Sequence, residues 1–238
     1  MSGTLYGIGV GPGDPELMTR KAWRLISAAP VVAYPAPDTG ESFARAIAAE
    51  AIGPDAEEIP IVVPMRTDRF PAQEIYDKAA DRLSAELYAG RDVAVLCEGD
   101  PFFYGSFMYL FERLAEQHRV DVVPGVSSLT ACAAALGRPL AARSEALAIL
   151  PGTMENDVLR SRIEAADAVA IIKVGHRLPR LRALMAEMGL LDRAGYVARA
   201  SLPAEEVLPL AEAPEAAPYF SMILIYRGGE PWPIRPPR

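Results

Sequence analysis

Two glycine-rich turns contain the residues whose types and spacing are suited to chemistry. The first is Gly9-Val10-Gly11-Pro12-Gly13-Asp14, and the second runs from Glu98 to Gly105 as Glu-Gly-Asp-Pro-Phe-Phe-Tyr-Gly. A third turn, Pro124-Gly125-Val126-Ser127-Ser128, has the same setting between an apolar run and a helical pattern. Ligands of open α/β sheets bind beyond the carboxyl ends of the strands, where such turns lie. Together the three turns predict a small-molecule site.

The turns do not match the templates for nucleotide phosphates. G-x-G-x-x-G fails because Asp14 stands where the third glycine should be, and no G-x-x-x-x-G-K-[ST] occurs. Carboxylates such as Asp14 and Asp100 are unfavourable beside a pyrophosphate but acceptable beside a cation. Asp14 also has a purely structural explanation, because it precedes Pro15 and Glu16 as the N-cap of a helix.

Composition and charge exclude several classes of protein. Of the 238 residues, 51% are hydrophobic and 23% are charged, which is ordinary for a globular chain. No apolar run approaches the roughly 18 residues of a spanning helix, and Met1-Ser2-Gly3 leads directly into a strand without a signal peptide. We therefore expect a cytoplasmic protein with no membrane partner. The net charge of −7 predicts no binding to nucleic acid.

The cysteines and histidines offer no metal site. Cys97 and Cys132 lie inside apolar runs, and His118 and His176 do not complete a zinc spacing. We expect both cysteines to be buried in the core and no bound metal.

Periodicity predicts an α/β fold with two α/β domains, residues 1–125 and 126–238. In the first half, short apolar strands alternate with helical patterns, which favours a mainly parallel sheet covered on both faces. The expected strands are 5–10, 30–34, 59–63, 92–97 and 120–123, and the expected helices are 15–28, 42–51, 71–89 and 106–117. The second half predicts a mixed sheet, with strands near 147–150, 168–174, 195–198 and 219–226 and helices at 127–136, 156–165 and 177–188.

The combined motifs resemble the tetrapyrrole methyltransferase family. The resemblance rests on Gly-Val-Gly-Pro-Gly-Asp-Pro-Glu-Leu-Met-Thr-Arg-Lys-Ala (9–22), Glu-Gly-Asp-Pro-Phe-Phe-Tyr-Gly-Ser (98–106) and Val-Pro-Gly-Val-Ser-Ser (123–128), and it covers essentially the whole chain. Residues 3–7, 103–109 and 172–175 are most similar to the members that methylate carbon C20 of the ring.

The resemblance implies a class III-type methyltransferase fold and a homodimer. It also implies that S-adenosylmethionine is held in the cleft between the two domains and leaves as S-adenosylhomocysteine. The positions that match the family's cofactor contacts are Pro12, Glu98, Gly99, Asp100, Phe103, Ser127, Ser128, Val174 and Ala200. Val174 departs from the methionine that relatives often have at its position.

The implied reaction is an in-line methyl transfer from the sulfonium to a ring carbon, which needs positioning and a base for the displaced proton. Asp100 and Tyr104 are the candidate catalytic residues. The substrate carries several carboxylates, so Arg143 and Lys173 are the first candidates to bind it. Other cations beside the turns are Arg66, Arg69, Arg138, His176 and Arg199.

Other functions within the resemblance stay open. They include methylation at another tetrapyrrole position, as in uroporphyrinogen III methyltransferases, methylation of the cobalt-containing ring, and modification of a protein histidine, as in diphthine synthase. Ribosomal RNA ribose methylation is disfavoured because the pI is near 5.0. A binding module without turnover is the remaining class.

Overall fold

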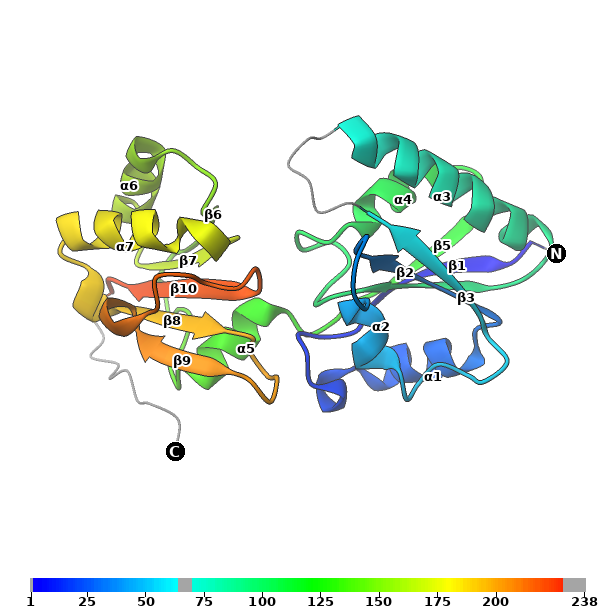
Figure 1. Cartoon of the computed structure of the whole chain (residues 1–238), viewed down its shortest axis with the longest axis horizontal. Coiled ribbons are helices and arrows are strands. Elements are labelled where there is room, and N and C mark those ends of the chain that lie inside the picture. Colours follow the sequence, from blue (N-terminus) through cyan, green and yellow to red (C-terminus); the bar gives the residue numbers. More distant parts are fainter. Residues whose placement is uncertain (1, 64–69, 229–238) are drawn as a thin grey trace. The chain divides into compact units, whose positions relative to one another are not determined.

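The structure, a computed structural model, describes residues 2–63 and 70–228 (Figure 1). Contacts within the chain divide it into two compact units, Met1–Ser127 (unit 1) and Ser128–Arg238 (unit 2). Each unit contains one five-stranded sheet with helices on its faces. The expected α/β class is therefore confirmed, whereas the division into domains of residues 1–125 and 126–238 stays a prediction.

Unit 1 is built on a parallel sheet with the strand order β3-β2-β4-β1-β5. Its strands are β1 (Thr4–Gly9), β2 (Val31–Ala36), β3 (Glu57–Val62), β4 (Val93–Cys97) and β5 (Arg119–Val123). Its helices are α1 (Arg20–Ala28), α2 (Phe43–Ala48), α3 (Phe70–Tyr88) and α4 (Phe107–Leu114), preceded by the 3-10 turn η1 (Pro15–Leu17). The alternation of strands and helices confirms the parallel sheet that the sequence predicts.

Helices cover both faces of this sheet (Figure 1). The helices α1 and α2 enclose one apolar core with Ile8 and Leu96, and α3 and α4 enclose the other with Leu5 and Val95. Successive residues of a strand point to opposite faces, so strands buried on both sides are apolar throughout. The expected burial of Cys97 is confirmed, because it lies in the second of these cores.

The prediction of one continuous helix over residues 15–28 is wrong, because the chain is not helical at Met18 and Thr19. Asp14 caps only the short turn η1, accepting a hydrogen bond from the Glu16 amide at 2.9 Å. Met18 is then extended, and Thr19 forms a second N-cap by accepting from the Ala22 amide at 3.1 Å. A threonine side chain competes for backbone donors in this way, and it starts α1 five residues later than the sequence pattern indicates.

Unit 2 has a mixed sheet with the order β6-β7-β10-β8-β9, which confirms the second prediction. Only β6 and β7 pair in parallel. The strands are β6 (Leu147–Pro151), β7 (Ala168–Ile172), β8 (Ala194–Ala198), β9 (Glu206–Pro209) and β10 (Ser221–Tyr226). The helices are α5 (Ser128–Ala135), α6 (Asn156–Glu164) and α7 (Leu178–Glu187), with the 3-10 turns η2 (Gly175–Arg177), η3 (Leu191–Arg193) and η4 (Leu210–Glu212). The strand β9 is too short for the sequence pattern to reveal.

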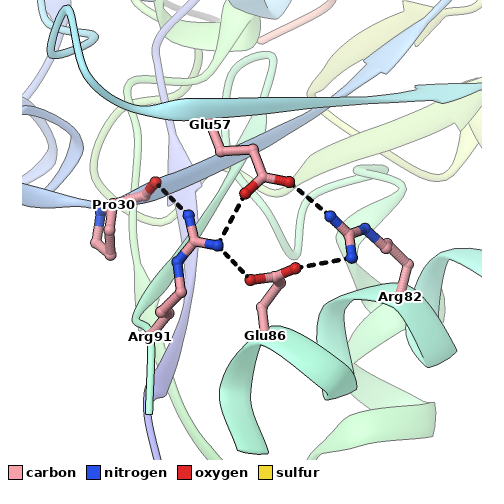
Figure 2. A network of polar contacts seen from close by, with 5 residues as sticks. All are labelled: Pro30, Glu57, Arg82, Glu86 and Arg91. Carbon is pink, nitrogen blue, oxygen red and sulfur yellow. Dashed lines mark hydrogen bonds and ion pairs between the residues drawn. The ribbon is translucent and has the colours of Figure 1, made fainter. Parts of the chain in front are cut away.

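Two arginines and two glutamates join the amino ends of the unit 1 strands (Figure 2). Glu57 begins β3 and contacts Arg82 at 2.5 Å and Arg91 at 2.8 Å. Glu86, which is buried on α3, contacts the same arginines at 2.8 and 2.7 Å. Arg91 also donates to the carbonyl of Pro30, just before β2, at 3.2 Å. The hydrogen bond from Arg91 lowers the pKa of Glu57. This network ties α3 to three strands.

We expect Glu86→Gln to lower the free energy of unfolding by roughly 1–2 kcal/mol, because a buried charge that neutralises two arginines is lost while the arginines are partly hydrated. Urea unfolding measures the difference. The matched control is Glu116→Gln at an exposed position, which we expect to change the stability by less than about 0.5 kcal/mol. Equal effects of the two substitutions would contradict a stabilising network.

Candidate functional site

The three glycine turns of the sequence lie at one edge of the unit 1 sheet. The strands β4, β1 and β5 are neighbours and run in parallel, with Gly9 opposite Cys97 and Ile8 opposite Val123. Their carboxyl ends therefore meet, and the chain leaves each strand directly into a turn. We call residues 10–14 the first loop, 98–106 the central loop and 124–127 the third loop.

Backbone hydrogen bonds join the first loop to the central loop. The Gly99 amide donates to the Gly11 carbonyl at 2.8 Å, and the Gly11 amide donates to the Gly99 carbonyl at 3.3 Å. The Val10 amide donates to Cys97 at 2.9 Å, which extends the pairing of β1 with β4. The two loops thus begin as a continuation of the sheet and not as separate flexible turns.

Gly9 and Gly125 allow the three loops to approach one another closely. A Cβ atom on Gly125 would lie 2.0 Å from the carbonyl oxygen of Gly99, and one on Gly9 would lie 2.5 Å from the same oxygen. A Cβ on Gly9 would also lie 2.6 Å from the Gly125 nitrogen. These distances leave no room for a side chain, so glycine is required at both positions by the packing of backbone on backbone.

The Asp100 carboxylate connects the central loop to the third loop. Its Oδ1 accepts from the Phe102 amide at 2.9 Å, and its Oδ2 accepts from the Gly125 amide at 3.1 Å. Each carboxylate oxygen has a second lone pair, so the group can still accept from a ligand. Asp100 therefore has a positioning role in addition to the cofactor and catalytic roles predicted for it.

Glu98 is partly buried beneath the central loop. Burial raises the pKa of this carboxyl above its ordinary value of 4.5, and the backbone amides of Glu98 itself and Ala44 act in the opposite direction. The amide of Ala44 belongs to the first turn of α2. The Glu98 carboxyl thus interacts with backbone amides of unit 1.

Other predicted residues of unit 1 lie on the same three loops. Pro12 is buried, and Phe103 and Ser127 are partly buried, whereas Ser128 is the exposed first residue of α5 and belongs to unit 2. Tyr104 is 47% exposed and has a φ of 56°. A bulky residue in this left-handed region costs on the order of 1–3 kcal/mol, and such strain is concentrated at functional sites.

In unit 2, predicted residues follow β7 and β8. Lys173 is exposed with a φ of 58°, and the next residue, Val174, is fully buried in the core. Ala200 is buried after β8, where Arg199 is exposed with a φ of 52°. Because the side chains of Val174 and Ala200 are buried in unit 2, these two residues can offer only backbone atoms to a ligand.

Arg143 lies in the loop between α5 and β6. It is exposed and has a φ of 51°. Glu145 closes this turn, accepting from the Ala142 amide at 2.8 Å and from the hydroxyl of Tyr226. A buried hydroxyl and a carboxylate therefore fix the backbone that carries Arg143.

The remaining cations named from the sequence have different positions. Arg138 is buried, stacks on the Tyr226 ring at 4.6 Å and donates to the Arg193 carbonyl at 3.1 Å. Burial lowers its pKa to about 10, and its guanidinium packs within unit 2. His176 is exposed in η2. Arg66 and Arg69 lie outside the described residues.

The sequence pattern does not reveal how closely the glycines pack, and it does not single out one exposed aromatic pair. Gly9 and Gly125 were recognised only as turn residues, although their spacing after apolar strands was the available signal. Tyr219 and Phe220 are exposed beside the turns of Lys173 and Arg199. Two aromatics directly before an apolar strand were a visible but nonspecific signal.

The chemistry of the three loops suits a ligand with positive charge. The Asp100 carboxylate lies where the central and third loops meet, and the close backbone packing there excludes side chains at Gly9 and Gly125. Within residues 2–63 and 70–228, no group of three His, Cys, Asp or Glu residues could hold a metal ion. In the same residues no helix is long and apolar enough to cross a membrane.

Residues 4–214 match the family of Tetrapyrrole (Corrin/Porphyrin) Methylases. The chain belongs to this family, and its fold is that of a methyltransferase of that class. The chain is 40% identical over 232 residues to the precorrin-2 C(20)-methyltransferase of Sinorhizobium sp, an alignment that covers 94% of this chain and 95% of the relative.

Two further similarities extend this result. The cobalt-precorrin-2 C(20)-methyltransferase of Salmonella typhimurium is 31% identical over 234 residues, 97% of this chain and 99% of the relative. The solved structure of uroporphyrin-III C-methyl transferase from Thermus thermophilus, complexed with S-adenyl homocysteine, is 28% identical with a TM-score of 0.66. That comparison covers 93% of this chain and 97% of the solved chain.

We expect Gly125→Ala to lower the free energy of unfolding by about 2 kcal/mol, because its Cβ must push the Gly99 carbonyl away and separate the loops. Chemical denaturation measures the change. The matched control is Gly53→Ala, whose Cβ would lie 3.4 Å from its nearest neighbour. If both variants retain the stability of the parent, the close contact of the loops is not a constraint.

The raised pKa of Glu98 predicts a pH dependence of stability. The folded state holds this proton more tightly than the unfolded state, so the contribution is fully present below pH 4.5 and is lost as the pH rises through the folded pKa. The free energy of unfolding of the parent minus that of Glu98→Gln should therefore fall as the pH is raised above 4.5. Urea titrations across this range test it, and a flat difference would contradict it.

Proposed function

We propose that this chain transfers a methyl group from S-adenosylmethionine to carbon C20 of precorrin-2, giving precorrin-3A in cobalamin biosynthesis. The observation that carries the proposal is the joining of three glycine loops around Asp100 at the carboxyl edge of β4, β1 and β5. The similarity to the Sinorhizobium enzyme over nearly the whole chain supports the choice of substrate and position.

The cofactor is proposed to lie on the three loops. Gly99 and Pro12 supply close backbone approach, Asp100 supplies an acceptor for a cationic group, and the remaining contacts come from Glu98, Phe103, Ser127 and Ser128. Val174 and Ala200 contribute backbone atoms of unit 2. When bound, S-adenosylmethionine supplies an electrophilic methyl group on a sulfonium. The loops fit this cationic cofactor because they offer oxygen acceptors. A phosphate group would instead require cations.

The chain's contribution to the reaction is positioning and proton removal. Backbone hydrogen bonds hold the loops in one conformation. Little conformational entropy is therefore lost when a ligand bound to them reacts. Asp100 and Tyr104 are the proposed groups that accept the proton displaced from the ring carbon. The Asp100 oxygens are already oriented by the amides of Phe102 and Gly125, so this carboxylate keeps one geometry.

Arg143 and Lys173 are proposed to bind the peripheral carboxylates of the tetrapyrrole. Both side chains are exposed, and each residue lies in a tight turn where its backbone has a left-handed conformation. Fixed cations of this kind select an anionic substrate although the protein carries a net charge of −7.

We also propose a homodimer that acts in the cytoplasm. The exposed apolar side chains Phe102, Met108 and Tyr109 give α4 and the loop before it a surface suited to a second copy of the chain. The two free cysteines fit a reducing compartment. Light scattering on the purified protein tests the dimer.

The cobalt-containing ring is a second candidate substrate. The similarity to the Salmonella enzyme over 97% of the chain favours it, at a lower identity than the metal-free case. The two candidate rings differ in whether cobalt is present at the centre. The same assay should therefore be run with both.

Incubation with S-adenosylmethionine and precorrin-2 should give a product one methyl group heavier, measured by mass spectrometry, with C20 identified by NMR. Asp100→Ala should weaken S-adenosylmethionine binding at least about 10-fold in calorimetry, since a charged acceptor and a loop contact are lost. The control is Asp81→Ala at an exposed position of α3. No methylated product from either ring would refute the proposed reaction.

A further inference from the structure

One edge of the unit 2 sheet collects two cations and two aromatic side chains. The strands β7 and β8 flank β10 and run antiparallel to it (Figure 1). The carboxyl ends of β7 and β8 therefore lie at the same edge as the amino end of β10. Lys173 follows β7, Arg199 follows β8, and Tyr219 and Phe220 precede β10.

Strand register places the aromatic pair between the two cationic turns. The Arg199 amide donates to the Phe220 carbonyl at 2.8 Å, one step beyond the pairing of Ala198 with Ser221. On the other side Ile171 pairs with Ile223. The strand β7 ends one residue later at Ile172, and the chain then turns at Lys173. The four side chains thus belong to adjacent chain segments at one edge.

The backbone at this edge has an unusual conformation. Lys173, Arg199 and Ser201 have φ values of 58°, 52° and 66°. L-residues rarely adopt this region, and a turn without another requirement would use glycine there. Strained backbone of this kind persists where the position of a side chain is needed. Both cations are exposed.

The aromatic pair is exposed although it adjoins an apolar strand. Tyr219 is 58% exposed and Phe220 is 43% exposed, and their ring centroids lie 5.2 Å apart at an interplanar angle of 80°. Exposed aromatic side chains that are anchored by a strand bind apolar ring faces. Cations on both sides of them suit a ligand with an apolar ring and anionic groups at its rim.

We propose that Tyr219 and Phe220, between Lys173 and Arg199, form a subsite of unit 2 that binds the tetrapyrrole substrate. The aromatic rings contact the face of the macrocycle, and the two cations pair with its peripheral carboxylates. The identity of the ligand rests on the proposed function. The subsite adds Arg199 and the aromatic pair to the residues that determine substrate affinity.

The decisive variant is Tyr219→Leu/Phe220→Leu, which keeps apolar side chains but removes both rings. We expect the KM for precorrin-2 to rise about 10-fold or more, while kcat at saturating precorrin-2 and the calorimetric Kd for S-adenosylmethionine change less than about twofold. The matched control is Tyr88→Leu, an exposed tyrosine at the end of α3 in unit 1, which should leave all three values unchanged.

Arg199 is tested by Arg199→Gln and the conservative Arg199→Lys. Gln should raise the KM for precorrin-2 with kcat unchanged, and Lys should restore most of the affinity because a cation returns to the same turn. Equal effects of Gln and Lys would assign Arg199 to the structure of the turn and overturn its pairing with a carboxylate.

Binding of uroporphyrin III, followed by its absorbance, separates the subsite from the reaction. If the parent protein binds this porphyrin and Tyr219→Leu/Phe220→Leu does not, the subsite stands even if precorrin-2 is not methylated. Unchanged porphyrin affinity and KM in the double variant would overturn the subsite. So would a selective loss of S-adenosylmethionine binding, or conversion of a dimer to a monomer in light scattering.

Discussion

Contact of backbone with backbone at Gly9, Gly99 and Gly125 is the constraint on which the proposed site depends. The carbonyl of Gly99 occupies space that any side chain at the other two positions would fill. The Asp100 carboxylate then fixes the third loop by accepting from the Gly125 amide. The strand order β4-β1-β5 brings these glycines together from distant parts of the sequence. The sheet and the loops therefore form one structural unit.

The sequence predicts the elements of this fold better than their connections. Apolar runs and helical periodicity identified both sheets because the strands are buried on their faces. The break between η1 and α1 was missed because Thr19 caps a helix inside a continuous helical pattern. The bond from Asp100 to Gly125 could not be predicted, since it depends on β1 lying beside both β4 and β5.

Charge was the least predictable property of the candidate site. Arg138 and Arg143 lie close together in the sequence, yet one is buried on an aromatic ring and the other is exposed in a strained turn. Composition cannot distinguish these cases, because an arginine stem packs as readily as its guanidinium binds an anion. Left-handed backbone at Tyr104, Arg143 and Lys173 is visible only in the structure, and the roles of these residues stay predictions.

The arginine–glutamate network lies at the amino ends of the unit 1 strands (Figure 2), while the three glycine loops follow the carboxyl ends of β1, β4 and β5. The amino-end edge of the unit 1 sheet therefore stabilises the fold, and the carboxyl-end edge carries the loops of the proposed site. The ion pairs hold the amino ends of the strands together, while the glycines and Asp100 hold the loops at the opposite edge. A chain of this design can acquire a different substrate by exchanging loop side chains, without rebuilding the sheet that carries them.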